Sequence, residues 1–177
     1  LLLRELGQTD ISMHTAWQLN ERSYGALQGL YKHKAEEKFG AEQVFLWRRG
    51  FDVAPPLLSD DDPRHPANDP LYGQVDQAVL PAGESLKDTV ERVRPYWDSD
   101  IVPRLNEGKT VLVVAHGNTL RAMKMFLEHL SPDEIMQVDI PYALPLVFEF
   151  EDDLSVLRSY YLSDTETFEK VVEELAQ

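Results

Sequence analysis

A short apolar run that leads into an amphipathic segment constrains the fold of this chain more than any other feature. Thr110–Ala115 reads TVLVVA, a β-branched apolar run typical of a strand that is buried on both faces. After His116, apolar residues recur at helical spacing: Leu120, Met123, Phe126, Leu127 and Leu130. A buried strand followed by a helix is typical of α/β domains, whose ligands bind at the carboxyl ends of the strands. We therefore predict an α/β fold with a site at His116.

A second strand-like segment ends beside charged residues. Apolar and polar residues alternate from Ile11 to Trp17, a period of two that predicts a strand leading to Glu21 and Arg22. The following segment, residues 32–49, is predicted to be helical with a break at Gly40. This arrangement places three cations, Lys32, Arg48 and Arg49, on elements close to the same loop.

Residues from about 50 to 83 have a composition that favours neither helix nor strand. Prolines occur at positions 55, 56, 63, 66, 70 and 81, together with the acidic run Asp60–Asp62. Irregular connections longer than about 12–15 residues are usually lids, binding loops or disordered segments. We expect a lid or a wall over the site, with a plain surface excursion as the alternative.

The remaining segments show helix and hairpin patterns. Ser85 and Asp88 have capping-box spacing at the start of an amphipathic helix, which Pro95 should kink or end. Leu146–Phe150 and Leu154–Leu162 are predicted strands around an acidic turn. The apolar residues expected on the buried face of the helix are Leu86, Val90, Val93, Trp97 and Ile101.

The size of the chain indicates one domain. A chain of 177 residues can bury well over half of its unfolded surface in one core, so we predict a single domain over residues 1–177. Leu1–Leu6 resembles the last turns of a helix, and a tail helix is predicted from Thr165.

Composition limits the partners and the chemistry. There is no cysteine, so the chain has neither disulfides nor thiolate metal sites, which fits the reducing cytoplasm. The formal charge of −14 disfavours nucleic acids and anionic membranes as partners. No apolar run approaches the roughly 20 residues that cross a bilayer. An anionic substrate would need a local cluster of cations. Salt screens charges over about 8 Å, so such a cluster can attract the substrate although distant acids give the chain its negative charge.

Four blocks carry a resemblance to a known family. Leu19–Leu30 reads LNERSYGALQGL and Val113–Arg121 reads VVAHGNTLR; Leu46–Arg49 and Glu84–Thr89 lie between them. In this order and spacing they resemble the cofactor-dependent phosphoglycerate mutases of the histidine phosphatase superfamily, and the likeness runs from about Trp17 to Tyr161. The resemblance implies a three-layer fold with an open, mostly parallel sheet and helices on both faces.

The family's nucleophile is not found in this sequence. Family members carry their nucleophilic histidine in an Arg-His-Gly-Glu segment, and no Arg-His-Gly triplet occurs here. The chain therefore reads as the C-terminal part of such an enzyme, and alone it would be inactive. His14, His33, His65 and His129 lack the flanking residues of that segment.

Two residues are the catalytic candidates. Phosphoryl transfer relies on positioning and charge neutralisation, and it needs a group that moves the proton of the substrate hydroxyl. His116 would supply charge and a hydrogen bond, unless it is simply a core histidine. Glu21 would be the general acid and base, unless it is a surface carboxylate paired with Arg22. The resemblance implies these same roles for both residues.

Several other residues are candidates for binding phosphate and carboxylate groups. Guanidinium forks bind such oxygens bidentately, and the amides at the start of a helix bind anions. As bare cations, however, Lys32, Arg48 and Arg49 would more often form a solvated helix face. The resemblance implies substrate binding by Arg22, Ser23, Tyr24, Lys32, Arg48, Arg49, Gly117 and Asn118, whereas Arg121 is expected to pair structurally.

Three functions remain open. The first is a mutase that interconverts 3- and 2-phosphoglycerate in glycolysis and gluconeogenesis, primed by 2,3-bisphosphoglycerate, without a metal. The second is a phosphatase of phosphate monoesters, and the third is an inactive fragment that binds phosphorylated ligands. The substitution of Tyr142 and Ala143 for a common Thr-Gly pair could alter substrate preference. The sequence is compatible with a homo-oligomer without indicating one.

Overall fold

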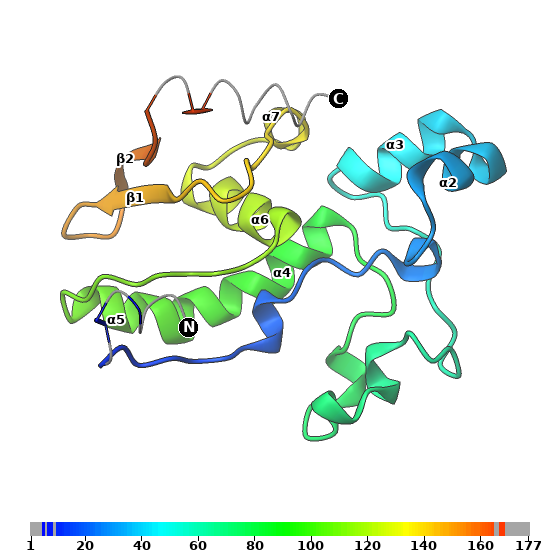
Figure 1. Ribbon diagram of the computed structural model, residues 1–177, viewed down its shortest axis with the longest axis horizontal. Helices are drawn as coiled ribbons and strands as arrows, with labels where there is room; N and C mark the ends of the chain where they lie inside the picture. The colour runs from blue at the N-terminus through cyan, green and yellow to red at the C-terminus, as the bar shows by residue number, and fades with distance from the viewer. Residues whose placement is uncertain (1–4, 6, 9, 165–166, 169–177) are drawn as a thin grey trace.

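Two helices packed side by side form the centre of the structure (Figure 1). The computed structural model describes residues 5, 7, 8, 10–164, 167 and 168. Within them, α4 (Leu86–Tyr96) packs against α6 (Gly117–Leu127). Leu86 lies in one apolar cluster with Ala122, and Val93 lies in a second with Met123. The two clusters fix where α6 begins, and so where the residues around His116 lie.

Local signals determine where α4 begins and ends. The Ser85 hydroxyl accepts from the Asp88 amide at 3.2 Å, and the Asp88 carboxylate accepts from the Ser85 amide at 2.8 Å, which confirms the predicted capping box. As predicted, α4 ends just after Pro95. Proline has no backbone N–H, so it cannot donate to the carbonyl one helical turn earlier. The chain continues as a π-helical turn, η6 (Trp97–Ile101), and then as α5 (Val102–Asn106).

A helical pair carries the predicted cations. α2 (Lys32–Phe39) and α3 (Ala41–Arg49) are separated at Gly40, as predicted. Gly40 has φ of 85°, a left-handed conformation that glycine adopts without strain, so the helix axis changes direction there. Figure 1 shows this pair beside the central helices.

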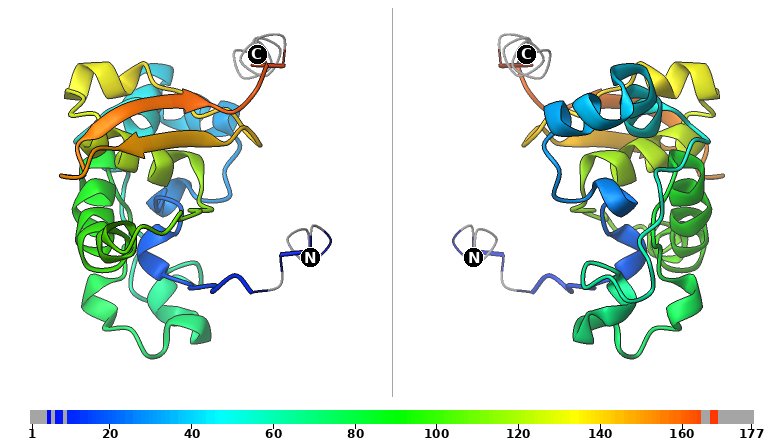
Figure 2. Two further views of the ribbon diagram at one scale, coloured as in Figure 1. Left: turned by 90° about the vertical axis from the view of Figure 1, so that its left-hand side faces the viewer. Right: turned by 90° about the vertical axis from the view of Figure 1, so that its right-hand side faces the viewer.

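The sheet is smaller than predicted. β1 (Leu146–Phe150) and β2 (Val156–Tyr161) form an antiparallel hairpin, confirming the predicted pair of strands. In Figure 2 the hairpin and the segment before Trp17 lie at different levels of the molecule. This hairpin is the two-stranded sheet found among the described residues.

The predictions of strands at Thr110–Ala115 and Ile11–Trp17 are wrong for the structure as described. Residues 110–115 carry no strand pairing, and Leu112 and Val114 are 70% and 84% exposed rather than buried on two faces. Val111 and Val113 do pack on the core, so the alternation correctly marked one apolar face. A strand, however, also needs a partner backbone, which periodicity does not reveal.

The Pro-rich segment at about 50–83, the Pro-rich excursion, contains only short 3-10 turns. These are η3 (Pro66–Asn68), η4 (Pro70–Tyr72) and η5 (Gln77–Val79). The excursion is fixed to the segment after Glu21, because the Ala26 amide donates to the Pro56 carbonyl at 2.8 Å. The other short elements are η1 (Trp17–Leu19), η2 (Gly25–Leu27) and α7 (Pro132–Met136).

The predicted terminal helices fall mostly on residues outside the described ranges. Within the described ranges, no helix combines the length and apolar character needed to cross a bilayer.

Candidate functional site

Two segments far apart in the sequence meet at the start of α6. The Thr119 hydroxyl donates to the Asn20 carbonyl at 2.6 Å, and the Asn118 side-chain amide donates to the Tyr24 hydroxyl at 2.8 Å. The Asn118 backbone amide donates to the Glu21 carboxylate over a longer distance of 3.3 Å. His116 is the residue that precedes the first turn of α6. The structure therefore brings the motif around Glu21 and the motif around His116 together.

Both catalytic candidates are accessible. His116 is exposed, which contradicts the alternative of a core histidine. Glu21 is partly buried and lines a cavity of about 560 Å³ with Arg22 and residues of the Pro-rich excursion. The Glu21 carboxylate accepts from the Arg22 backbone amide at 2.6 Å. The Arg22 guanidinium donates to the carbonyls of Glu84 and Arg48, so the structure does not show the alternative, a surface ion pair between Glu21 and Arg22.

Arg22 is a buried cation at the base of the site. Its side chain donates to the Glu84 carbonyl at 3.5 Å and to the Arg48 carbonyl at 3.3 Å, while its Nε is buried without a partner. The residue is only 2% exposed. Its guanidinium lies 4.6 Å from the centre of the Tyr24 ring, and that of Arg48 lies 5.4 Å from the same ring. The Tyr24 ring therefore supports two positive charges close to Glu21.

Arg121 is a second buried cation, on α6. It donates to the Asn118 side-chain carbonyl at 3.0 Å and to the Ile135 carbonyl at 2.7 Å, and its Nε is buried without a partner. Burial lowers the pKa of Arg121 to about 10, with further lowering by the nearby charges of Arg49 and Arg22. Arg121 thus orients Asn118, in agreement with the predicted structural role, and adds positive charge behind it.

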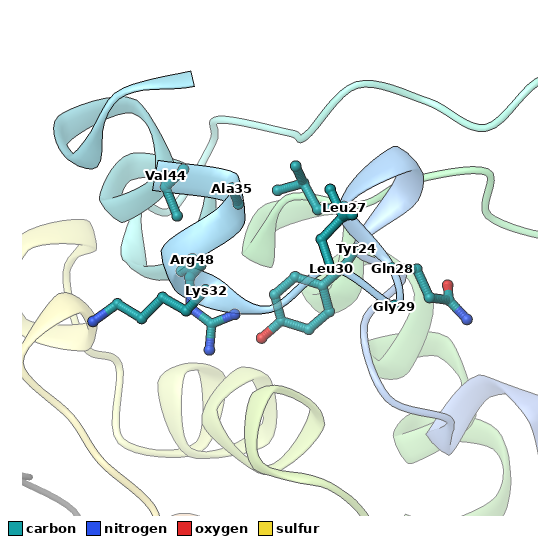
Figure 3. A pocket seen from close by; sticks show the side chains of 9 residues that line it. All are labelled: Tyr24, Leu27, Gln28, Gly29, Leu30, Lys32, Ala35, Val44 and Arg48. Carbon is teal, nitrogen blue, oxygen red and sulfur yellow. The ribbon is translucent and has the colours of Figure 1, made fainter. Parts of the chain in front are cut away.

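Lys32 and Arg48 lie at one side of a smaller pocket of about 170 Å³. In Figure 3 their charged ends and the Tyr24 hydroxyl lie on the same side of this pocket. The apolar part of the lining comprises Leu27, Leu30, Ala35 and Val44. Lys32 is largely solvated and lies 3.8 Å from Glu36, so only Arg48 combines exposure with a fixed support on Tyr24.

Arg49 is engaged by an acid. One Nη atom of Arg49 lies 2.6 Å from a carboxylate oxygen of Asp139, and the two side chains are 35% and 54% exposed. Arg49 therefore lies near the site with part of its charge neutralised. A ligand anion that binds Arg49 would compete with Asp139.

The remaining predicted residues lie close to the same place. The Ser23 hydroxyl accepts from the Gly25 amide at 3.4 Å, so in this structure it contacts its own turn. A Cβ atom built on Gly117 would meet nothing within 4 Å, so the chain surface there is open for close approach. Among the described residues, no group of three or more His, Cys, Asp or Glu side chains is arranged to hold a metal ion.

The sequence profile of the histidine phosphatase superfamily (branch 1) matches residues 58–163, which is more than half of the chain. The chain belongs to this superfamily. It is 49% identical over 176 residues to the 2,3-bisphosphoglycerate-dependent phosphoglycerate mutase of Hamiltonella defensa subsp. Acyrthosiphon pisum (strain 5AT). It is 46% identical to the proteins of the same name from Borreliella burgdorferi (strain ZS7) and Borreliella afzelii (strain PKo). Each alignment covers 99% of this chain and 71% of the relative.

In this member of the histidine phosphatase superfamily, sequence reasoning missed two residues beside the site, Glu84 and Arg92. Their side chains are 3% and 7% exposed and form an ion pair with an N–O distance of 2.7 Å. Glu84 begins one of the blocks that carry the resemblance, but the sequence alone suggested no role for it. The apolar spacing gave no signal for Arg92, because the residue before Val93 points away from the apolar side of the predicted helix.

Proposed function

We propose that the protein carrying this sequence is a 2,3-bisphosphoglycerate-dependent phosphoglycerate mutase, which interconverts 3- and 2-phosphoglycerate in glycolysis and gluconeogenesis. The observation that carries this proposal is the pair of buried arginines, Arg22 and Arg121. Arg22 follows Glu21 in the chain and Arg121 donates to Asn118, and the Nε atom of each arginine has no hydrogen-bond partner among the described residues. Their other N–H groups donate to uncharged oxygens, so an anionic ligand nearby would offset the cost of burying the two charges. The names of the 46–49% identical relatives support the same reaction.

The site residues divide the work of phosphoryl transfer. Glu21 would move the proton of the substrate hydroxyl, since its carboxylate is partly exposed at the cavity. His116 would stabilise the phosphoryl group in transit by charge and a hydrogen bond, from its exposed place before α6. The amides at Gly117 and Asn118 would add the positive end of the α6 dipole.

The cationic side chains would bind the other ends of the substrate. Arg48, supported on Tyr24, and Lys32 would face phosphate or carboxylate oxygens, with the Tyr24 hydroxyl beside them. Arg22 would contribute its charge from beneath, and Arg49 would exchange Asp139 for the ligand. Ser23 would bind the substrate from the lining of the Glu21 cavity.

The primer, 2,3-bisphosphoglycerate, fits this set of donors because it is a small polyanion. Arg48 and the amides at the start of α6 would hold it, with the charge of Arg22 beneath, and when bound it would supply the phosphoryl group of the phosphorylated enzyme. The family mechanism also requires a nucleophilic histidine. Since the 177 residues contain no Arg-His-Gly sequence, our proposal assigns that histidine to residues outside them.

We also propose a fold and a cellular location for the enzyme. We propose a three-layer, mostly parallel sheet with helices on both faces for the enzyme, within one domain over residues 1–177. The excursion at about 50–83 would form a wall or lid, supported by its place in the lining of the Glu21 cavity. We place the enzyme in the cytoplasm, acting on small phosphoglycerates without a metal, nucleic acid or membrane.

Two measurements test the function. The intact mass of the purified protein shows whether it exceeds the 20.3 kDa of these residues, as our assignment of the nucleophile requires. The purified protein is then assayed with 3-phosphoglycerate and catalytic 2,3-bisphosphoglycerate. Formation of 2-phosphoglycerate that depends on the primer supports the mutase. Release of inorganic phosphate without isomerisation would support the phosphatase, and binding without either reaction would support the inactive fragment.

A further inference from the structure

We infer that Arg92 and Glu84 are positioning residues that hold the segment carrying Glu21 against α4, and so fix its place relative to α6, which packs on α4. The inference rests on the proposed function, because it gives the two residues a part in the reaction that Glu21 serves. Arg92 borders the Glu21 cavity, but its side chain is only 7% exposed and donates to Glu84 and to backbone carbonyls, so we assign it no contact with the substrate.

Arg92 ties three backbone carbonyls of one segment to α4. Its Nη1 donates to the Gln18 carbonyl at 2.6 Å, and longer contacts of 3.4 Å reach the carbonyls of Trp17 and Asn20. These residues directly precede Glu21. The same guanidinium lies 6.0 Å from the centre of the Trp17 ring. One buried side chain therefore fixes the approach of the chain to Glu21 from the N-terminal side.

Glu84 holds the same segment on the other side of Glu21. One oxygen of its carboxylate accepts from the Ser23 amide at 2.9 Å, and the Glu84 amide donates to the Ser23 carbonyl at 2.9 Å. The Glu84 carbonyl also accepts from Arg22 at 3.5 Å. The backbone on both sides of Glu21 is thus bonded to one ion pair.

The pair itself has the geometry of a fork. The Arg92 Nε donates to one Glu84 oxygen at 2.7 Å, and its Nη2 donates to the other at 3.0 Å. Only arginine can bind a carboxylate in this way and still donate to carbonyls with its remaining N–H groups. A lysine would keep the charge but would lose either the fork or the carbonyl contacts.

The consequence for Glu21 follows from the length of its contact with α6. Its carboxylate reaches the Asn118 amide at 3.3 Å, which is already long for a hydrogen bond. A small shift of the segment would break this contact and move the carboxylate relative to the Asn118 turn. A displacement of about 1 Å in a catalytic group can cost roughly 10²-fold in rate.

The test compares Arg92→Lys with Arg94→Lys, an exposed arginine of the same helix that pairs with Asp98 at 3.1 Å. In the purified enzyme we expect Arg92→Lys to lower kcat by about 10- to 100-fold while KM for 3-phosphoglycerate changes less than about threefold. Arg94→Lys should leave both constants unchanged. Unchanged kcat in Arg92→Lys, with an active wild type, would overturn the inference and leave the mutase function intact.

A double-mutant cycle separates positioning from general stability. If Arg92 acts through Glu21, Arg92→Lys should lower kcat much less in a Glu21→Gln background than in the wild type. Equal losses in the two backgrounds would show that Arg92 serves only the fold.

A measurement independent of activity completes the test. We expect the Ser23 amide to exchange its hydrogen at least tenfold faster in Arg92→Lys than in the wild type or Arg94→Lys. Unchanged exchange would contradict the inference even in a protein without mutase turnover, whereas absence of wild-type turnover alone would contradict only the proposed function. Glu84→Gln, which keeps side-chain volume, serves as the second variant if Arg92→Lys does not fold.

Discussion

At the scale of single residues, the Glu21 carboxylate has backbone amides as its partners, that of Arg22 at 2.6 Å and that of Asn118 at 3.3 Å. We expect Glu21→Gln to lower kcat by about 10²-fold or more, because glutamine cannot transfer the proton of the substrate hydroxyl. Binding of 2,3-bisphosphoglycerate, followed by calorimetry, should change little. Glu42→Gln in the first turn of α3 is the control, and near-normal turnover of Glu21→Gln would remove Glu21 from its role.

The ion pair of Arg49 predicts a substitution that strengthens substrate binding. Asp139→Asn would free Arg49 from its 2.6 Å ion pair, so the affinity for phosphoglycerate should rise. Exposed ion pairs are worth about 0.2–1 kcal/mol, which corresponds to a fall in KM of up to about fivefold. Asp133→Asn, in the first turn of α7, is the matched control. An unchanged or higher KM in Asp139→Asn would show that Asp139 does not compete with the substrate.

At the scale of elements, the turn that follows Tyr24 depends on close approach to the excursion. Gly25 has φ of 52°, and a Cβ atom there would lie 2.2 Å from the Pro56 carbonyl oxygen. Gly29 has φ of 83° but faces open space. Both alanine variants accept left-handed strain of roughly 1 kcal/mol, and only Gly25→Ala adds a clash of about 1–3 kcal/mol more.

Urea unfolding of the two alanine variants measures this difference. The midpoint should fall clearly further for Gly25→Ala than for Gly29→Ala. Equal midpoints would mean that the excursion moves away from the turn at little cost.

Elements whose signals are local could be predicted from the sequence. The break at Gly40, the Ser85 and Asp88 capping box, and the hairpin all depend on residues close in the chain. The segment after Thr110 was predicted incorrectly because strand pairing depends on a distant backbone. For the same reason Arg92 was missed, since the backbone carbonyls that accept from it lie 72 to 75 residues away.

At the scale of the whole molecule, charge and site oppose each other. The chain carries a formal charge of −14, while its candidate site gathers arginines around Tyr24. Motifs predicted candidate residues whose segments the structure brings together, but they did not indicate that Arg22 and Arg121 would be buried. Nothing in the spacing of isolated arginines indicates which of them a fold will bury.

Salt distinguishes the local cations from the distant acids. If the arginines dominate, screening should weaken binding, and we expect KM for 3-phosphoglycerate to rise about threefold or more from low salt to 0.5 M KCl. Steady-state kinetics at constant pH measure this, with sucrose of equal osmolarity as the control. A KM that falls with salt would mean that repulsion by the net charge governs binding.

The contacts at the start of α6 join residues that are 97 and 99 positions apart in the chain. A polyanion held between the Glu21 side and the α6 side would therefore act as a removable cross-link that closes a very large loop. Because it binds only when both sides are in place, it would shift the unfolding equilibrium by mass action. The thermal stability of the protein would then rise with the concentration of its phosphoglycerate ligands. The lifetime of the enzyme would thereby be linked to the supply of its substrate.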